Sequence, residues 1–213
     1  MTQLIFATAN PHKLAEVQAM MPDSISLLSL ADIGFSGDIP ETEPTLEGNA
    51  LQKARYIFKR FGKPCFSDDT GLETEALNGA PGVYSARYAG VTGSQEEKAQ
   101  ANMRKLLAAL SSASTRKARF RTVIAYIDVS GNPHLFEGVV NGAISEKPHG
   151  TTGFGYDPVF IPDGYHLSFA QIPLDEKNRI SHRARAFEKF LAYIQSHCCP
   201  LNPKKVQFVH LSY

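Results

Sequence analysis

The strongest constraint on the fold lies at the start of the chain, where a short apolar run leads through a turn into a helical pattern. Residues 4–7 predict a buried strand, residues 8–11 have turn chemistry, and the apolar spacing of residues 12–21 predicts a helix. A strand, a loop and a helix in this order are typical of an α/β fold. Ligands in such folds bind at the C-terminal ends of strands, so this loop is the first candidate for a binding site.

The rest of the chain contains both helical and strand-like patterns. Helical spacing recurs over residues 46–61, after the capping box at residues 94–97, and over residues 181–195. Strand-like runs occur at residues 65–66, 119–129 and 135–144, and residues 130–133 predict a hairpin turn. This order predicts an α/β protein with a mixed β-sheet flanked by helices. The hairpin builds a second lobe, and a central cleft separates the two lobes.

Composition limits the class of protein. The length of 213 residues fits one large domain or two intimate lobes. The 22 basic and 21 acidic residues give a net charge of only +1, which disfavours a nucleic-acid partner. The three cysteines have no framework spacing and the N-terminus has no leader, so a cytoplasmic protein is expected. No apolar stretch is long enough to span a bilayer, so no membrane partner is expected.

The first candidate site is a phosphate-binding loop, made of Thr8, Ala9, Asn10, Pro11, His12 and Lys13. A turn that leads into a helix presents free backbone N–H groups, and such a helix start attracts phosphate. Lys13, the Thr8 hydroxyl and the Asn10 amide can reach the same anion. The alternative is a helix cap followed by a solvated lysine, and this segment alone does not decide between the two.

The second candidate is the acidic pair Asp68-Asp69, which Thr70 and Gly71 follow. Two adjacent carboxylates at the end of a buried strand repel one another, and a cation offsets that repulsion. Oxygen-rich sites of this kind suit Mg²⁺ beside substrate phosphates. A polar turn is the alternative, since Asp and Gly favour turns, but the apolar residues before the pair favour a site.

An acidic loop before residue 48 supplies further carboxylates. Glu41, Glu43 or Glu47 could complete a metal shell together with the acidic pair. On the local pattern alone, a solvated acidic loop is the better interpretation.

Two later segments carry groups that suit a base and a sugar. Three glycines within residues 150–155 indicate close approach of the backbone to a ligand. Beside them, Phe154 or Tyr156 could stack on a base, and Asp157 could accept a hydrogen bond. Residues 177–183 combine cations and hydrogen-bond donors. For residues 150–157 the alternative is a glycine-rich turn with core aromatics. For residues 177–183 it is a solvated basic face.

Taken together, these segments resemble the inosine triphosphate pyrophosphatase family, which includes dITP/XTP pyrophosphatases. The matching stretches are residues 6–13, 45–50, 67–72, 79–88, 153–158 and 181–183. The resemblance implies hydrolysis of ITP, dITP and XTP to the monophosphate and pyrophosphate, which removes them from the nucleotide pool. It also implies an elongated sheet with two lobes, a Mg²⁺ cofactor and a homodimer. Residues 1–196 carry the matching unit, and residues 197–213 have no assigned role.

Carried over by position, the resemblance assigns roles around the phosphates. Residues 8–13 hold the triphosphate, and Thr70 contacts substrate. Asp69 is the general base and a Mg²⁺ ligand, while Glu41 is the second metal carboxylate and Glu43 remains an alternative for that place. Asp68 is a supporting carboxylate of open role.

The resemblance also assigns the surroundings of the base and the sugar. The residues expected there are Phe154, Gly155, Tyr156, Asp157, Lys177, His182 and Arg183. Selectivity for a 6-oxo purine needs hydrogen-bond donors that face O6, and backbone N–H groups, His182 and Arg183 can supply them. A Maf-like pyrophosphatase of other nucleotides and a non-catalytic nucleotide-binding module are the two alternatives.

Overall fold

A computed structural model of the chain describes residues 2–197. Its strands are β1 (Thr2–Phe6), β2 (Ile25–Leu28), β3 (Cys65–Thr74), β4 (Pro81–Gly82), β5 (Lys117–Ile127), β6 (Pro133–Ile144) and β7 (Phe160–Pro162). Its α-helices are α1 (Pro11–Met20), α2 (Leu46–Phe61), α3 (Gln95–Ala109), α4 (Leu174–Ile180) and α5 (His182–His197). Helix α2 has the predicted bounds, and the predicted capping box opens α3.

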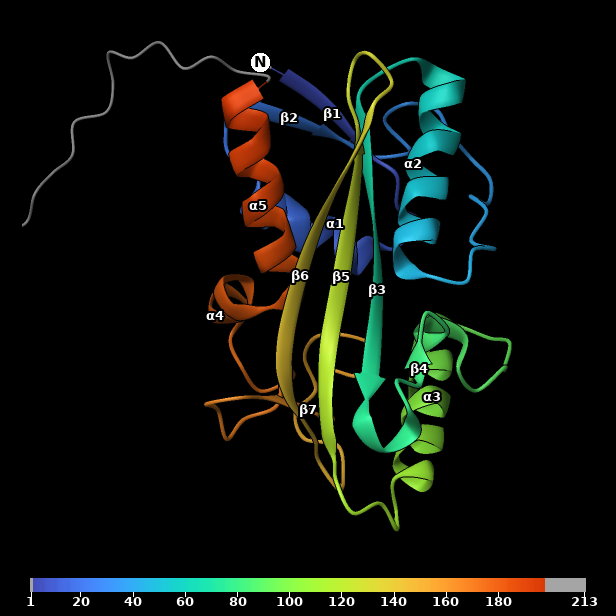
Figure 1. Cartoon of the computed structure of the whole chain (residues 1–213), viewed down its shortest axis with the longest axis vertical. Coiled ribbons are helices and arrows are strands. Elements are labelled where there is room, and N and C mark those ends of the chain that lie inside the picture. The colour runs from blue at the N-terminus through green and yellow to red at the C-terminus, as the bar shows by residue number, and fades with distance from the viewer. Residues whose placement is uncertain (1, 198–213) are drawn as a thin grey trace, which may run out of the picture.

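One mixed sheet organises these elements. Its strands follow the order β2-β1-β3-β5-β6-β7, and β4 pairs with β3 beside that path. β1 is parallel to β2 and β3, whereas β3, β5, β6 and β7 are antiparallel to one another in succession. The predicted hairpin is β5 and β6, and these strands run through most of the length of the molecule (Figure 1).

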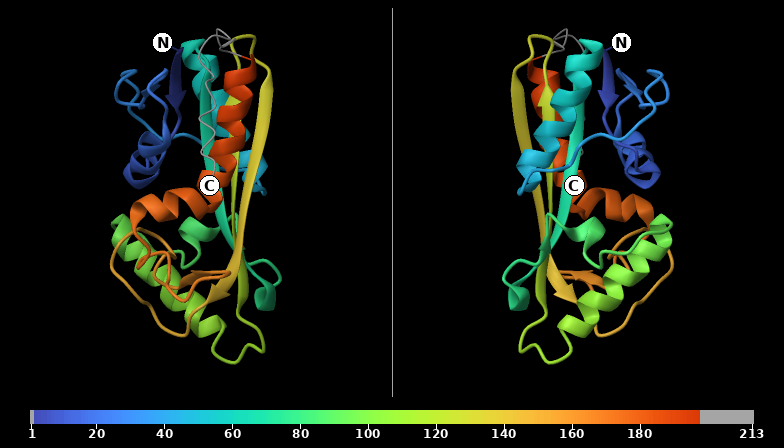
Figure 2. Two further views of the ribbon diagram at one scale, coloured as in Figure 1. Left: turned by 90° about the vertical axis from the view of Figure 1, so that its left-hand side faces the viewer. Right: turned by 90° about the vertical axis from the view of Figure 1, so that its right-hand side faces the viewer.

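The long strands connect two lobes, which lie one above the other in Figures 1 and 2. In the upper lobe, α2 covers one face of the sheet, and α1 and α5 cover the other, each over its own apolar cluster. In the lower lobe, α3, β7 and the loops around them enclose a third cluster that includes Phe120, Phe160 and Phe169. The elongated sheet with two lobes confirms the predicted fold class.

Strand β3 differs from the sequence prediction. The pattern predicts a strand at residues 65–66 that ends in a turn at the acidic pair, but β3 continues to Thr74 and pairs with β5 along its whole length. Asp and Gly favour turns where local preference decides. Here pairing with β5 gives the backbone groups of β3 hydrogen-bond partners, and cations from distant segments pair with both carboxylates. The turn prediction was therefore wrong, and Asp68 and Asp69 lie in the middle of a strand.

The other edge of β3 is only partly paired. β1 pairs with Cys65 and Phe66, and β4 pairs with Leu72 and Glu73. Between them, no strand of the described chain covers residues 67–71 on that edge. An unpaired strand edge presents backbone N–H and C=O groups. The acidic pair and Thr70 lie on this open stretch of β3, at the junction of the two lobes.

Several elements escape the sequence patterns. Neither α4 nor the short strands β2, β4 and β7 are predicted, because each is too short to show a clear period. The predicted helix over residues 181–195 begins one residue later, since Ser181 closes α4. The sequence also has a strand-like run at residues 206–211, and this run and the cysteines at 198 and 199 lie outside the described residues. Within residues 2–197, no helix has the length and apolar character that crossing a bilayer requires.

Candidate active site

The two carboxylates of the acidic pair point to opposite faces of the sheet. Successive side chains alternate between faces along a strand, and the partners of each carboxylate show the same separation. Asp68 contacts side chains from α1 and α5, whereas Asp69 contacts side chains from α2. The pair is therefore not one metal-binding turn but two distinct sites that share a strand.

On the face of α1 and α5, Asp68 is an anchor for cations. Lys13 Nζ lies 3.1 Å from Asp68 Oδ1, and Arg183 Nε lies 3.1 Å from Asp68 Oδ2. Thr70 Oγ1 lies 3.2 Å from Arg183 Nη2 and 2.7 Å from the Thr122 hydroxyl. Burial works to raise the pKa of Asp68, but Lys13 and Arg183 outweigh it and hold that pKa well below its usual range. Asp68 is therefore a charged, fully engaged carboxylate.

Glu16 of α1 extends this network into the segment expected to hold the base. Its carboxylate accepts from Lys177 Nζ at 2.8 Å and also from Arg183 Nη1. Lys177 Nζ lies 2.7 Å from Asp157 Oδ2, so one ammonium group joins acids from two lobes. All three nitrogen atoms of the Arg183 guanidinium have partners. Arg183 thus organises the network through three of its five N–H groups.

On the face of α2, Asp69 is less fully neutralised. Lys53 Nζ lies 3.4 Å from Asp69 Oδ1 and 2.5 Å from Glu41 Oε1, while Asn49 Nδ2 donates to Asp69 Oδ2 at 3.2 Å. Burial raises the pKa of Asp69, and the like charges of Glu41 and Asp68 add to the rise, against the opposing effect of Lys53. A carboxylate with a raised pKa is a better proton acceptor than an ordinary surface aspartate.

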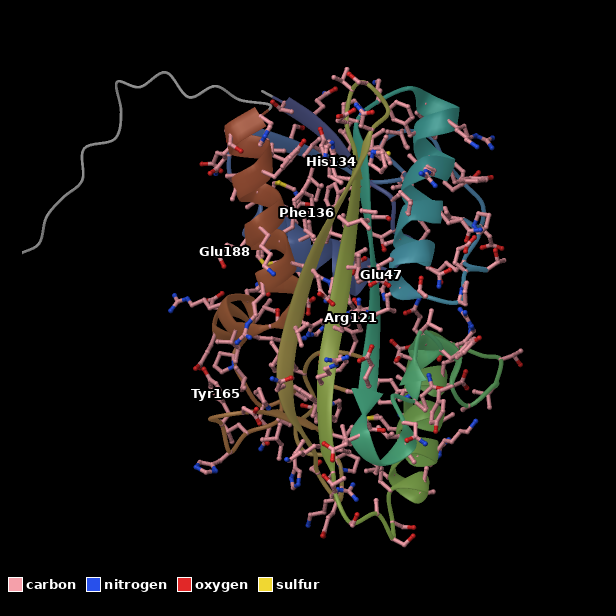
Figure 3. The ribbon with its side chains drawn as sticks, viewed as in Figure 1. Glu47, Arg121, His134, Phe136, Tyr165 and Glu188 are labelled. Carbon is pink, nitrogen blue, oxygen red and sulfur yellow. The ribbon has the colours of Figure 1, made fainter. Side chains whose placement is uncertain are left out.

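The structure separates the three glutamates of the acidic loop. Glu41 reaches Lys53 beside Asp69, but Glu43 lines a groove over α2 instead. Glu47 forms an ion pair with Arg121 of β5, and the two side chains lie together on the front of the sheet in Figure 3. Arg121 also pairs with Glu137 of β6. Glu41 is thus the glutamate that shares a cation with Asp69.

The donor set around Lys53 fits a magnesium ion. Glu41 and Asp69 already contact one cation, the Lys53 ammonium group. Mg²⁺ commonly binds through one or two protein carboxylates and completes its shell with water and substrate phosphates. Among residues 2–197, no three His, Cys, Asp or Glu side chains form a complete cage. An ion held by two carboxylates and by phosphates needs no such cage.

At the start of α1, more of the backbone N–H groups already have hydrogen-bond partners than the sequence predicts. Asn10 Oδ1 accepts from His12 N at 2.9 Å and from Lys13 N at 3.3 Å, so those two backbone groups are capped rather than free. Asn10 N in turn donates to Thr8 Oγ1 at 3.2 Å. A hollow of about 340 Å³ borders residues 8–11 on the side of residues 29–37. Lys13 is the group of this loop that points to the acidic strand.

The glycine-rich loop is built around Asp157. Asp157 Oδ2 accepts from Phe154 N at 2.9 Å as well as from Lys177, which folds the loop back on itself. Gly153 has a φ of +75°, and a Cβ there would meet Asp157 Oδ2 at 2.2 Å, so only glycine fits. Gly155 also has a positive φ, of +63°. The Phe154 ring lies 5.2 Å from Lys177 Nζ and 5.7 Å from Arg183 Cζ, at the rim of the charged network.

Tyr156 does not stand beside Phe154 as a second stacking residue. Its ring belongs to the core of the lower lobe, and its hydroxyl donates to the Ser85 carbonyl at 2.9 Å. Tyr156 is therefore a core aromatic and not a surface for stacking a base, whereas Phe154 is partly exposed. A buried aromatic two positions from a partly exposed one cannot be recognised from the sequence, because loops have no regular period.

His182 opens α5 as a buried and neutral side chain. It stacks on Phe120 with ring centroids 4.5 Å apart. Burial lowers the pKa of His182 well below its usual value, and the positive charges of Arg183 and Lys177 add to the shift. Its Nδ1 is buried without a hydrogen-bond partner among the described residues. Gly138 of β6 lets α5 approach this closely, because a Cβ there would meet the His182 carbonyl at 2.0 Å.

The arrangement thus combines an acid with a raised pKa, several cations and a stacking ring at the junction of two lobes. A model of the Ham1 family matches residues 4–193. The chain belongs to the Ham1 family. This result confirms the resemblance drawn from the sequence motifs.

Proteins similar to this Ham1 chain align with it over nearly its whole length. A dITP/XTP pyrophosphatase of Porphyromonas gingivalis is 57% identical over 187 residues, which are 87% of this chain and 94% of that protein. A dITP/XTP pyrophosphatase of Flavobacterium johnsoniae is 49% identical over 89% of this chain and 96% of that protein. A solved HAM1 protein structure from Coxiella burnetii superposes with a TM-score of 0.82 at 37% identity, covering 92% of this chain and all of the other.

Three side chains of the Ham1 site escaped the sequence analysis: Glu16, Asn49 and Lys53. Glu16 follows Lys13 by three positions on α1, and Asn49 and Lys53 are four apart on α2, so each set lies on one helix face. For Glu16 that spacing is a weak signal, because an acid one turn from a candidate phosphate ligand is known to be buried only once its partners are known. For α2 the signal is weaker, since lysines at such positions usually face solvent.

Proposed function

We propose that this chain hydrolyses nucleoside triphosphates of deaminated purines, namely ITP, dITP and XTP, to the monophosphate and pyrophosphate. Its relatives from Porphyromonas gingivalis and Flavobacterium johnsoniae carry the name dITP/XTP pyrophosphatase, and they align over almost the whole chain. Hydrolysis of these nucleotides removes them from the pool used for nucleic-acid synthesis. The chain is thus a nucleoside triphosphate pyrophosphatase that acts on the α–β phosphoanhydride bond.

One geometric observation supports this chemistry most directly. Asp69 lies on the open stretch of β3, where it shares Lys53 with Glu41, while Asp68 on the other face is engaged by Lys13 and Arg183. A hydrolase of phosphoanhydrides needs a carboxylate that accepts a proton from water and cations that neutralise the phosphates. Both requirements meet at this one point of the sheet.

The chain's own groups divide the work of the reaction. Water attacks the α-phosphorus, its proton passes to the Asp69 carboxylate, and the bond to the β-phosphate breaks so that pyrophosphate leaves. Asn49 fixes Asp69 by donating to Oδ2. Lys13 and Lys53 neutralise negative charge on the phosphates, and Asp68 keeps Lys13 in position through its 3.1 Å contact. Positioning and electrostatic neutralisation supply most of the acceleration in phosphoryl transfer.

Glu41 and Asp69 are the proposed ligands of a Mg²⁺ ion. When bound, the ion supplies charge neutralisation at the phosphates and lowers the pKa of water. Lys53 contacts the same two carboxylates, so it holds them close together before the substrate arrives. Its ammonium group is then available to the phosphates.

The proposed base site lies between Phe154 and the start of α5. The partly exposed Phe154 ring offers a stacking surface, and purines stack more strongly on it than smaller bases because they bury more area. His182 Nδ1 is buried and without a partner among the described residues. A ligand atom that pairs with it would relieve a penalty of about 1–3 kcal/mol. If Nδ1 carries the proton, the keto oxygen at position 6 of hypoxanthine or xanthine satisfies it, whereas the amino group of adenine does not.

We also propose that the protein acts as a homodimer in the cytoplasm. The family resemblance supports the dimer, and the composition and cysteine pattern support a reducing compartment. Sedimentation analysis of the full-length chain tests the dimer, since a monomer at micromolar concentration contradicts it.

The decisive experiment is incubation of ITP with the protein and MgCl₂, followed by separation of the products. IMP and pyrophosphate are expected, and turnover is expected to stop when EDTA removes the metal. IDP and orthophosphate would overturn the α–β assignment. In a panel of triphosphates at equal concentration, a preference for dTTP or UTP would favour the Maf-like alternative. Tight ITP binding without turnover would favour a binding module.

A further inference from the structure

One contact links the phosphate loop of the upper lobe to the glycine-rich loop of the lower lobe. The imidazole ring of His12 stacks on the Phe154 ring, with centroids 5.2 Å apart and planes inclined by 14°. His12 is exposed, whereas the two other groups beside Phe154, Lys177 and Arg183, are buried. The imidazole therefore covers part of the Phe154 ring from the solvent side.

A nucleobase on Phe154 would occupy the same space. Aromatic rings stack with centroids about 4.5–7 Å apart, and the His12 ring already lies within that range. The face of one phenyl ring does not accommodate an imidazole and a purine side by side. Stacking of a base on this face of Phe154 therefore requires the imidazole to leave.

The structure allows that movement without disturbing the loop. The backbone N–H of His12 is held by Asn10 Oδ1 at 2.9 Å, and Pro11 precedes it at the first position of α1. Within residues 2–197, the His12 side chain makes no hydrogen bond or ion pair, and it stacks only on the Phe154 ring. An exposed side chain on a fixed backbone changes rotamer within nanoseconds. The imidazole can thus swing into solvent while the loop keeps its shape.

We propose that His12 is a placeholder for the purine base: it covers Phe154 in the empty site and gives way when a nucleotide binds. This inference rests on the proposed function, and it assigns His12 to the base rather than to the phosphates of its own loop. The imidazole competes with the base for one ring face, so it weakens the binding of every ligand that carries a base. Ligands with phosphate but no base do not meet this competition.

The test compares two probes and two substitutions. IMP carries a base and a phosphate, whereas ribose 5-phosphate carries the same sugar phosphate without a base. For His12→Ala, the dissociation constant of IMP should fall by about twofold to tenfold, which is the size of one aromatic stacking contact. For His12→Phe, which stacks at least as well as imidazole, it should stay equal or rise. The dissociation constant of ribose 5-phosphate should not change in either variant, as titration calorimetry can measure.

Each other result overturns the placeholder. Weaker binding of both probes by His12→Ala would make His12 a phosphate ligand. Weaker binding of IMP alone would make it a second wall that stays on the base. Unchanged binding of IMP would mean that the stacked contact does not compete.

A measurement without nucleotide separates this inference from the proposed function. In the empty protein, the carbon-bound protons of the His12 ring should resonate upfield of their positions in a Phe154→Leu variant, because of the phenyl ring current. The shift should disappear when IMP is added to the wild-type protein. If wild-type protein shows the shift but neither hydrolyses ITP nor binds IMP, the proposed function fails and the placeholder fails with it. Normal IMP binding with no ring-current shift overturns the placeholder alone.

Discussion

Asp68 and Asp69 are neighbours on one strand, yet they lie in opposite electrostatic surroundings. Asp68 faces α1 and α5, where Lys13 and Arg183 hold it as a charged anchor. Asp69 faces α2, where burial and nearby acids raise its pKa and Lys53 is its one ion-pair partner within residues 2–197. A strand produces this contrast directly, because adjacent side chains point to opposite faces.

The contrast shows how a site divides structural and chemical work between identical groups. A carboxylate with a depressed pKa holds cations in place but accepts a proton poorly. A carboxylate with a raised pKa is a weaker anchor and a better base. Two titratable groups whose surroundings push their pKa values apart are a recurrent feature of acid–base sites. On this view, Asp68 positions the site and Asp69 carries out the reaction.

The largest expected effect is on the reaction itself. Asp69→Asn should lower kcat for ITP by about 10²–10⁴-fold, the usual contribution of a general base. Its stability should be equal to or above that of the wild type, because the substitution removes a buried carboxylate whose charge is disfavoured. Steady-state kinetics and urea unfolding measure the two effects. Near-normal turnover would remove Asp69 from its role as base.

Substitution of the neighbouring acid should have the reverse pattern. Asp68→Asn leaves Lys13 without its buried counter-charge and removes one of the two carboxylates that pair with Arg183, so the free energy of unfolding should fall by about 3–5 kcal/mol. Urea unfolding measures this loss. Asp38→Asn, at an exposed position, is the charge-matched control and should change stability little. If Asp68→Asn were as stable as this control, the comparison between the two faces would fail.

A third change disturbs the Asp68 face without touching a charge. Gly138→Ala places a methyl group where the His182 carbonyl and Ala186 N now lie, at 2.0 and 2.4 Å. Helix α5 must shift, and overpacking of this kind destabilises by about 1–3 kcal/mol. Arg183 should move away from Asp68, whereas the contacts of Asp69 with α2 should persist. Thermal unfolding measures the loss. Gly62→Ala is the comparison for backbone strain without overpacking, because a Cβ there meets nothing within 4 Å but the φ is +62°, and it should leave the contact between Arg183 and Asp68 in place.

The smallest expected effect is a dependence of stability on pH. Burial lowers the pKa of His182 in the folded protein, while in the unfolded chain it is about 6.5. Below that value the unfolded chain binds more protons than the folded protein, so stability falls as the pH drops. Between pH 7.5 and 5.5, His182→Asn should lose about 1 kcal/mol less stability than the wild type. The exposed His166→Asn control should behave as the wild type does, and equal losses in all three proteins would contradict a buried neutral His182.

The sequence predicted the elements whose pattern is long and regular. Helix α2, the capping box of α3 and the hairpin of β5 and β6 all follow from local spacing, and the structure has them. Prediction failed where hydrogen bonding between strands overrides the local conformational preference of the residues. The residues from Asp68 to Gly71 have the composition of a turn, but pairing with β5 makes them strand.

Part of the candidate site was also accessible from sequence. The motifs singled out Lys13, Asp69, Phe154 and Glu41, and the structure brings Lys13, Asp69 and Glu41 to one stretch of β3. Glu16 and Lys53 were missed, because a buried charge is recognised only by its partner. Those partners lie far along the chain: Glu16 contacts a residue 167 positions away.

The sequence by itself determined the long helices and strands, the family and the residue types that gather at the lobe junction. These follow from periodicity and from motifs, which are properties of short segments. Only the tertiary structure decided which acid holds cations and which is left to accept a proton. That decision depends on which face of β3 each side chain takes and on cations 55 and 115 residues away from Asp68. Charges act through space, so two identical neighbours in sequence acquire different pKa values only once the chain has folded.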